Sequence, residues 1–389
     1  MNTPSPSSLP AGFRAIVSNI GIKDETDDVV IVAADSPVAA AGVFTQSRFV
    51  GPSVTVSREH LSNHTATAMV VISKNANVAN GENGMRDTLE VVQLAARQAG
   101  CDVTDVLIAS TGVIGRPYPM DRIRSGFEGL KQHDWTAGLN DVARAIMTTD
   151  TVEKSSSATI EGSTAVISGV AKGVGMLEPH MATMISIVLT DADLAPQDLD
   201  SIFRRVVDKS FNCVSVDGDT STSDTAVILA SGAAGSVSLE AFEQGLEQVC
   251  IDLARQIASD GEGAETLIEV LVDEARDDDQ ARRVAKSIVN SPLVKTAVHG
   301  ADPNWGRIAM AVGKVNDDDI DQDSVTIRIG NKELFPQQVS NQELEELSNY
   351  LKRDEVLIHV SLGINQGAAR VWGCDLTDGY VRINADYTT

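Results

Sequence analysis

The segment Lys172–Asp193 places a sharp turn directly before a long apolar run. Its first four residues, KGVG, contain two glycines separated by one residue, a spacing typical of a backbone bend. The run Met184–Leu189 is apolar and partly β-branched, which predicts a buried strand. Thr183 stands where the loop enters this strand. Its hydroxyl is therefore expected on a rigid element, as a nucleophile requires.

The residues alone allow two interpretations of Thr183. A threonine hydroxyl is a poor nucleophile without an adjacent base, and the threonine's own amine supplies one once the chain is cut just before it. In that reaction the Thr183 hydroxyl attacks the Ala182 carbonyl, an ester forms, and water releases it. The small side chain of Ala182 leaves room for the attack. The other interpretation, which the pattern alone favours, is an ordinary β-forming residue at the start of a strand.

The wider segment, KGVGMLEPHMATM followed by TDA, closely resembles the self-cleavage region of the glutamate N-acetyltransferase/ornithine acetyltransferase family, including its branch from clavulanic-acid-type gene clusters. Further resembling segments follow the family's order over nearly the whole chain: KNANVA at 74–79, STGVIG at 110–115, MTTDT at 147–151, DTSTSD at 219–224, DPNWGR at 302–307 and NADYTT at 384–389. One departure is His180, where the family usually has Asn or Asp. It bears on cleavage rate or pocket polarity, not on the nucleophile.

The resemblance implies a cut between Ala182 and Thr183. Residues 1–182 would then form an alpha chain and residues 183–389 a beta chain that begins with the nucleophile, both within one catalytic core. The implied fold is an αββα-type sandwich of the ornithine acetyltransferase/DmpA kind with a smaller C-terminal lobe. Composition and the alternation of strands and helices alone predict only a layered α/β fold.

The resemblance also implies an oxyanion hole formed by Thr111 and Gly112. From the residues alone, Ser110-Thr111-Gly112 follows the predicted strand 105–109, so it is either a set of donors for a developing oxyanion or a simple strand-to-turn transition. Glu262, between two glycines, is either a contact for a substrate amine or part of a surface turn. The substrate-binding residues that the resemblance implies are Thr148 (in preference to Thr149), Lys172, Thr183, Glu262, Asn384 and Thr389.

The implied reaction is ping-pong transfer of an acetyl group from N2-acetyl-L-ornithine to L-glutamate through acetyl-threonine, in arginine biosynthesis or a related secondary-metabolite pathway. The alternatives are an enzyme that also uses acetyl-CoA, an amide hydrolase or acyltransferase acting on another amino acid, and a catalytically silent binding protein. The alpha and beta fragments are expected to associate and to assemble into a homo-oligomer.

Composition excludes some other classes of function. The formal net charge is −24, which argues against nucleic-acid binding because a phosphate-binding surface is basic. The four cysteines have no CxxC spacing and the six histidines no HExxH pair, so we expect no metal site, and no motif predicts a cofactor. The N-terminus lacks signal-peptide features, and no apolar run approaches the ~20 residues that span a bilayer. We therefore expect a cytoplasmic protein with no membrane partner.

Local patterns give further expectations. Val29–Ala34 and Val38–Phe44 read as two strands, and Gly84–Gly100 as a helix with Met85, Leu89, Val92 and Ala96 on one face. The pattern also predicts a strand at 211–216, turn-rich chain at 291–307 and a last strand at 380–383.

Overall fold

The computed structural model describes residues 8–178 and 184–386. The chain divides into two compact units. The first contains Met1–Asn212 and Asp219–Leu253 together with Thr389, and the second contains Cys213–Gly218 and Ala254–Thr388. The smaller C-terminal lobe expected from the sequence corresponds to the second unit.

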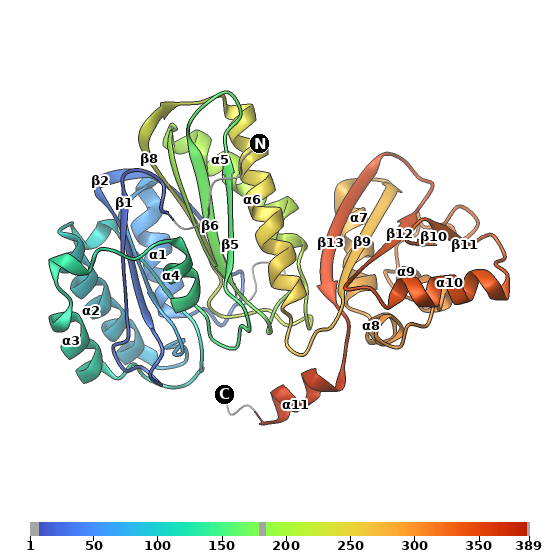
Figure 1. Ribbon diagram of the computed structural model, residues 1–389, viewed down its shortest axis with the longest axis horizontal. Helices are drawn as coiled ribbons and strands as arrows, with labels where there is room; N and C mark the ends of the chain where they lie inside the picture. The colour runs from blue at the N-terminus through green and yellow to red at the C-terminus, as the bar shows by residue number, and fades with distance from the viewer. Residues whose placement is uncertain (1–7, 179–183, 387–389) are drawn as a thin grey trace. The chain divides into compact units, whose positions relative to one another are not determined.

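The first unit is built on one sheet of eight strands in the order β4-β3-β2-β8-β7-β6-β5, with β1 paired to β2 (Figure 1). The strands are β1 (Phe13–Ser18), β2 (Val29–Phe44), β3 (Thr65–Ile72), β4 (Val106–Ser110), β5 (Lys154–Thr159), β6 (Val166–Lys172), β7 (Ile185–Asp193) and β8 (Thr225–Ser236). The predicted strand at Met184–Leu189 is confirmed as β7, whose first eight residues are all buried.

Strand β2 connects two layers of this sheet. The sequence predicted two strands here, but the structure has one strand of 16 residues with a register irregularity between Ala33 and Val38. Before the irregularity β2 pairs with β3, and from Ala39 to Phe44 it pairs with β8. The three residues at 35–37 are exposed and interrupt the apolar pattern. The sequence therefore predicts a turn here, although the strand continues.

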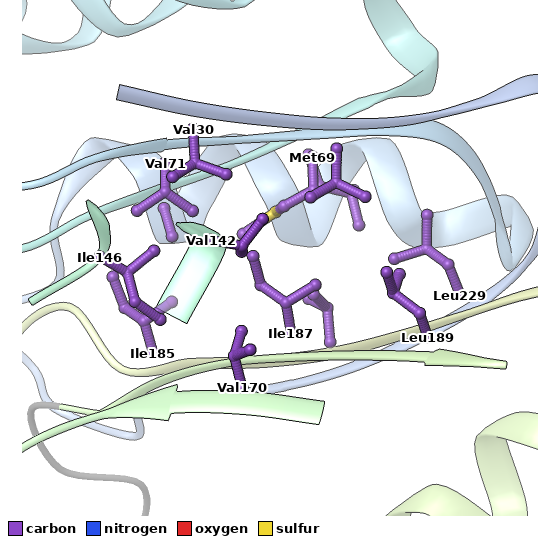
Figure 2. Close-up of a cluster of buried hydrophobic side chains, with 14 of the residues drawn as sticks. Val30, Met69, Val71, Val142, Ile146, Val170, Ile185, Ile187, Leu189 and Leu229 are labelled. Atoms are coloured by element: carbon purple, nitrogen blue, oxygen red, sulfur yellow. The ribbon is translucent and has the colours of Figure 1, made fainter. Parts of the chain in front are cut away.

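The core lies between the two layers, as Figure 2 shows. Val30, Met69 and Val71 project from β2 and β3 toward Ile187 and Leu229 of β7 and β8. Helix α4 (Leu139–Ala145) contributes further buried side chains to the same core. Because alternate residues of a strand point to opposite faces, the intervening residues of β2 and β3 belong to a second cluster on the outer face.

Helices cover both outer faces, which completes an αββα sandwich. Helices α1 (Pro52–His60), α2 (Gly81–Ala99) and α3 (Met120–Gly129) pack their buried residues against β1–β4. On the other layer, α5 (Pro196–Lys209) packs on β2, and α6 (Leu239–Ser259) lies against Gly169 of β6. The expected sandwich is therefore confirmed.

The predicted helix at Gly84–Gly100 is present as α2, and Gly100 closes it in the left-handed conformation with φ 78°. Its inner face is rotated from the prediction: Val91, Val92 and Ala96 are buried, whereas Leu89 is 38% exposed. The sequence analysis placed Leu89 on the apolar face because spacing was its only guide.

The second unit has a five-stranded sheet in the order β11-β10-β12-β9-β13. Its strands are β9 (Leu267–Ala275), β10 (Thr326–Ile329), β11 (Lys332–Phe335), β12 (Glu355–Ser361) and β13 (Gly367–Cys374). Helix α7 (Asp278–Val289) packs on β9 and β13. The remaining helices are α8 (Pro292–His299), α9 (Trp305–Gly313), α10 (Asn341–Leu351) and α11 (Asp378–Asp386).

Three local predictions are wrong. Residues 211–216 form a 3-10 turn and an irregular segment instead of a strand. The segment 291–307 carries α8 and the start of α9, because Ser291 caps α8 by accepting a hydrogen bond from the Val294 amide and Pro292 starts the helix. The predicted strand at 380–383 is part of α11. Among the described residues, no helix is long and apolar enough to cross a membrane.

Candidate active site

Strand β4 delivers Thr111 and Gly112 into a buried corner of the first unit. Thr111 is 1% exposed, and its backbone amide donates to the Ile72 carbonyl at the end of β3 (3.1 Å). The hydroxyl is therefore the group of Thr111 that can still donate a hydrogen bond, since its amide is engaged. Any set of donors at Ser110-Thr111-Gly112 therefore does not include the Thr111 backbone amide.

Gly112 occupies a position that only glycine fits. Its φ is +129°, a conformation that other residues avoid. A Cβ atom there would lie 2.3 Å from the carbonyl carbon of Lys74. The backbones of the two loops are thus packed in direct contact.

The loop that contacts Gly112 is itself strained. Lys74, Asn77 and Ala79 all have positive φ, at 72°, 52° and 64°. Each such non-glycine residue costs about 1–3 kcal/mol and persists only where its surroundings hold it. The Asn77 side-chain amide does this by donating to the Gly84 carbonyl (2.8 Å) and the Thr88 hydroxyl (3.0 Å). Strain of this kind is typical of active sites.

Lys172, at the end of β6, reaches Thr111 from the other layer of the sandwich. Its side chain is 2% exposed, and its ammonium nitrogen donates to the Thr111 hydroxyl oxygen over 3.2 Å. The two residues are 61 positions apart in the sequence. The structure therefore brings together three of the predicted site residues: Thr111, Gly112 and Lys172.

Asp150 links the remaining parts of this corner, and the sequence analysis assigned it no role. Its side chain is fully buried, and Oδ1 accepts hydrogen bonds from the Lys154 ammonium (2.8 Å) and the Gly173 amide (2.8 Å). Its Oδ2 accepts from the amide of Thr148 (3.1 Å), which places that predicted substrate residue in the same cluster. The Lys172 ammonium lies 4.0 Å from Oδ2.

The charges around Asp150 decide its ionisation. Burial raises the pKa of its carboxyl. Lys172, Lys154 and the Gly173 amide lower the pKa by more than burial raises it, and the result is a pKa of about 2. Asp150 is consequently a carboxylate at neutral pH.

A second buried carboxyl, Asp224, directly precedes β8 and lies beside the start of β7, and the sequence analysis assigned it no role either. It is 0% exposed, and its Oδ1 accepts a hydrogen bond from the Met184 amide (2.9 Å). Its Oδ2 is buried with no hydrogen-bond partner among the described residues, since the nearby Thr45 hydroxyl donates to the Ser221 carbonyl instead. Burial raises the pKa of Asp224 well above its ordinary value of 3.8. The pKa values of the two buried carboxyls are therefore shifted in opposite directions.

Three predicted residues lie outside the described residues. Ala182 and Thr183 belong to the segment 179–183, as does the unusual His180, and Thr389 belongs to 387–389. Their roles remain predictions. Met184, which follows Thr183 directly, is described and buried.

The second unit brings two other predicted residues together. The Asn384 side chain on α11 donates hydrogen bonds to the Glu262 carboxylate (2.9 Å) and to the Tyr380 carbonyl (3.1 Å). Gly263, next to Glu262, has φ +71°, and a Cβ there would lie 2.4 Å from the Tyr380 amide nitrogen. The loop after α6 and the start of α11 are thus in close backbone contact.

The second unit also contains a group able to bind a metal ion, although the sequence predicted none. Ligand atoms of Glu265, His299 and Asp375 all lie within 4.8 Å of one another. Asp375 has protein partners: Oδ1 accepts from the Glu265 and Thr266 amides, and Oδ2 lies 3.1 Å from His299 Nδ1. These contacts favour a structural role for His299.

The ArgJ family model matches residues 14–389 of this chain. The chain belongs to the ArgJ family. It is 52% identical over 384 residues to the "Arginine biosynthesis bifunctional protein ArgJ 2" of Nostoc sp., covering 98% of this chain and 99% of that protein. It is 50% identical over 395 residues to the "Glutamate N-acetyltransferase Oat2" of Streptomyces clavuligerus, covering 99% of each. The crystal structure of an arginine biosynthesis bifunctional protein from Bacillus halodurans is 44% identical, with a TM-score of 0.49, and the match covers 52% of this chain and 98% of that one.

Proposed function

We propose that this chain is a glutamate N-acetyltransferase that moves the acetyl group from N2-acetyl-L-ornithine to L-glutamate. The observation that carries the proposal is the convergence of Thr111, Gly112 and Lys172 on one buried corner, in a chain whose relatives are named for this activity and for arginine biosynthesis. A buried cation beside a hydroxyl donor favours negative charge, which develops on a carbonyl oxygen during acyl transfer.

The nucleophile in this proposal is the hydroxyl of Thr183. It first attacks the Ala182 carbonyl, so that an ester replaces the peptide bond and the Thr183 amine is freed. Water then hydrolyses this ester, which leaves Ala182 with a carboxylate and returns the Thr183 hydroxyl. That amine then takes the hydroxyl proton when the oxygen attacks the acetyl group of N2-acetyl-ornithine, and passes it to the departing ornithine amine. Glutamate attacks the acetyl-threonine in the second half-reaction. Thr111 and Gly112 stabilise the oxyanion in both halves, a contribution of about 3 kcal/mol for each donor.

Substrate binding is assigned to Thr148, Lys172, Thr183, Glu262, Asn384 and Thr389. The Thr148 amide bonds to Asp150, which supports its place beside Lys172. The Asn384–Glu262 hydrogen bond supports a shared role for these two residues toward the ornithine amine.

The strand order supports the idea that the two fragments stay together. Strands β7 and β8 follow the proposed cut, yet they lie between β2 and β6, which precede it. Both fragments, 1–182 and 183–389, would thus share one sheet. We further propose a homo-oligomer of such alpha-beta units in the cytoplasm, where the four free cysteines are expected to stay reduced.

The experiment is purification followed by intact mass measurement and a panel of donors and acceptors. We expect two co-purifying fragments and acetyl transfer from N2-acetyl-ornithine that depends on glutamate. Thr183→Ala should remain a single chain, and Thr183→Ser, which keeps a hydroxyl, should still be cut. An uncut wild-type protein with full activity contradicts the mechanism, and acetate release without glutamate indicates an amide hydrolase instead.

Acetyl-CoA is the second donor to include in the panel. Several relatives are named bifunctional, including the Nostoc sp. protein. Glutamate acetylation from acetyl-CoA would extend the proposed function without changing the role of Thr183.

A further inference from the structure

Asp150 is the common partner of groups from three neighbouring segments. Its carboxylate accepts hydrogen bonds from Thr148, Lys154 and Gly173, which lie before β5, at the start of β5 and directly after β6. Its side chain is completely shielded from solvent. A single buried side chain therefore contacts the segment before β5, the start of β5 and the residue that follows Lys172.

Lys172 is held between Asp150 and Thr111. Its ammonium group lies 4.0 Å from Asp150 Oδ2 and 3.2 Å from the Thr111 hydroxyl oxygen. An ammonium group has no acceptor, so the Thr111 oxygen must accept this hydrogen bond and the Thr111 proton is directed elsewhere. A hydroxyl that accepts from a cation is a stronger donor through its own proton, because successive hydrogen bonds polarise one another.

We propose that Asp150 is a positioning residue for acetyl transfer, which holds the Lys172 ammonium against Thr111 so that the Thr111 hydroxyl donates to the substrate oxygen. Lys172 then acts on the acetyl-transfer step through Thr111, so the effect of Asp150 on kcat depends on the Thr111 hydroxyl. The inference rests on the proposed function, and it gives Asp150 a role that the proposed function does not include.

The ionisation of Asp150 is consistent with this role. Burial raises its pKa, yet Lys172 and Lys154 bring the pKa to about 2, so the carboxylate is charged throughout the neutral range. The neutral form would not attract the Lys172 ammonium in this way.

The test is a double-mutant cycle on acetyl transfer from N2-acetyl-ornithine to glutamate. Asp150→Asn keeps the shape and one acceptor oxygen but removes the charge. We expect kcat to fall about ten-fold with little change in KM, because a charge-assisted contact that acts only in the transition state is lost. Thr111→Val alone should lower kcat by about 10²-fold. The double variant should be no slower than Thr111→Val, because Asp150 acts through the hydroxyl that is already absent.

Asp191→Asn is the matched control. Asp191 is a buried carboxylate near the other end of β7, and its oxygens accept from the Val166 and Ala11 amides. We expect its kcat to equal that of the wild type. Asp150→Asn leaves the buried Lys154 ammonium without its charged partner, which can prevent folding. In that case Asp150→Asn is combined with Lys154→Met, and this variant replaces Asp150→Asn in the cycle. The proposal is overturned if kcat is unchanged in Asp150→Asn. It is also overturned if the fold-decrease in kcat of the double variant equals the product of the fold-decreases of the two single variants.

A crystal structure of Asp150→Asn separates this inference from the proposed function. We expect the distance between Lys172 Nζ and Thr111 Oγ1 to increase from 3.2 Å to beyond hydrogen-bonding range. An unchanged distance contradicts the positioning role even if no substrate is turned over. If the wild type fails to transfer acetyl groups but the distance changes as expected, the proposed function is wrong and the positioning of Lys172 stands.

Discussion

The backbone amide of Met184 donates a hydrogen bond of 2.9 Å to Asp224, a carboxyl group that is completely buried. The Met184 carbonyl in turn accepts from the amide of Thr225 (3.0 Å). Asp224 and Thr225 therefore fix both backbone groups of the residue that follows Thr183. A buried amide that loses such an acceptor is costly, which makes this contact a point at which structure and proposed function are tested together.

Asp224→Asn should be well tolerated, whereas Asp224→Ala should not. The asparagine keeps a neutral acceptor for the Met184 amide, in line with a carboxyl whose pKa burial has raised. The alanine leaves that amide buried without a partner, which costs about 1–3 kcal/mol of the free energy of unfolding. Urea denaturation of both variants measures this difference. Equal losses in the two variants would show that the hydrogen bond to Met184 is not what stabilises the start of β7.

The pH dependence of stability should also change in Asp224→Asn. Above its ordinary pKa of 3.8 the unfolded protein releases the Asp224 proton while the folded protein keeps it. The wild type therefore loses stability as pH rises from about 4 toward the folded pKa, by up to about 1.4 kcal/mol per pH unit from this group. Asp224→Asn lacks the effect, so its stability relative to the wild type should increase between pH 4 and pH 7. A constant difference would mean that Asp224 is ionised in the folded protein.

Gly112→Ala should disrupt the candidate active site more than Gly115→Ala. Both glycines have positive φ, but a Cβ at Gly112 would meet Lys74, whereas a Cβ at Gly115 meets nothing within 4 Å. We expect Gly115→Ala to cost about 1 kcal/mol from backbone strain. Gly112→Ala should cost several kcal/mol in all, because overpacking adds about 1–3 kcal/mol to the strain. Thermal denaturation and acetyl transfer kinetics check both variants, and equal behaviour would mean that the Lys74 loop moves aside freely.

Glu262→Gln should weaken binding of the acetyl donor while the protein stays folded. The substitution removes the charge proposed to contact the ornithine amine but retains an oxygen that accepts from Asn384. A hydrogen bond to a charged group is worth about 1.5–3 kcal/mol, so KM for N2-acetyl-ornithine should rise about ten-fold or more. Glu265→Gln, in the same loop, is the control and should leave KM unchanged. A normal KM in Glu262→Gln removes this residue from the proposed binding site.

Much of the architecture could be predicted from the sequence because it depends on strong local patterns. The helix predicted at Gly84–Gly100 is present as α2, since a long amphipathic repeat and a closing glycine define it. The prediction of a strand at 380–383 was wrong for the opposite reason. Helix α11 buries none of its residues, so it has no core-facing pattern for the sequence to display.

The site itself was only partly accessible to sequence reasoning. Thr111 and Lys172 drew attention because each stands at the end of an apolar strand, yet nothing local shows that their side chains meet. Asp150 and Asp224 were missed because an aspartate beside threonines or serines usually belongs to a solvated turn. Only the packing of distant strands reveals that both are buried.

The position of β7 and β8 between β2 and β6 has a consequence for the order of folding and cutting. After the proposed cut the protein is a complex of two polypeptides, so unfolding by denaturant becomes a dissociation and its midpoint depends on protein concentration. The second fragment cannot join at an edge of the sheet, because both of these strands are interior. In the uncut chain the covalent link keeps the two halves at a high effective concentration. The sheet must therefore assemble before the chain is cut, and a cut enzyme that is denatured and diluted is expected to recover far less completely than the uncut Thr183→Ala chain.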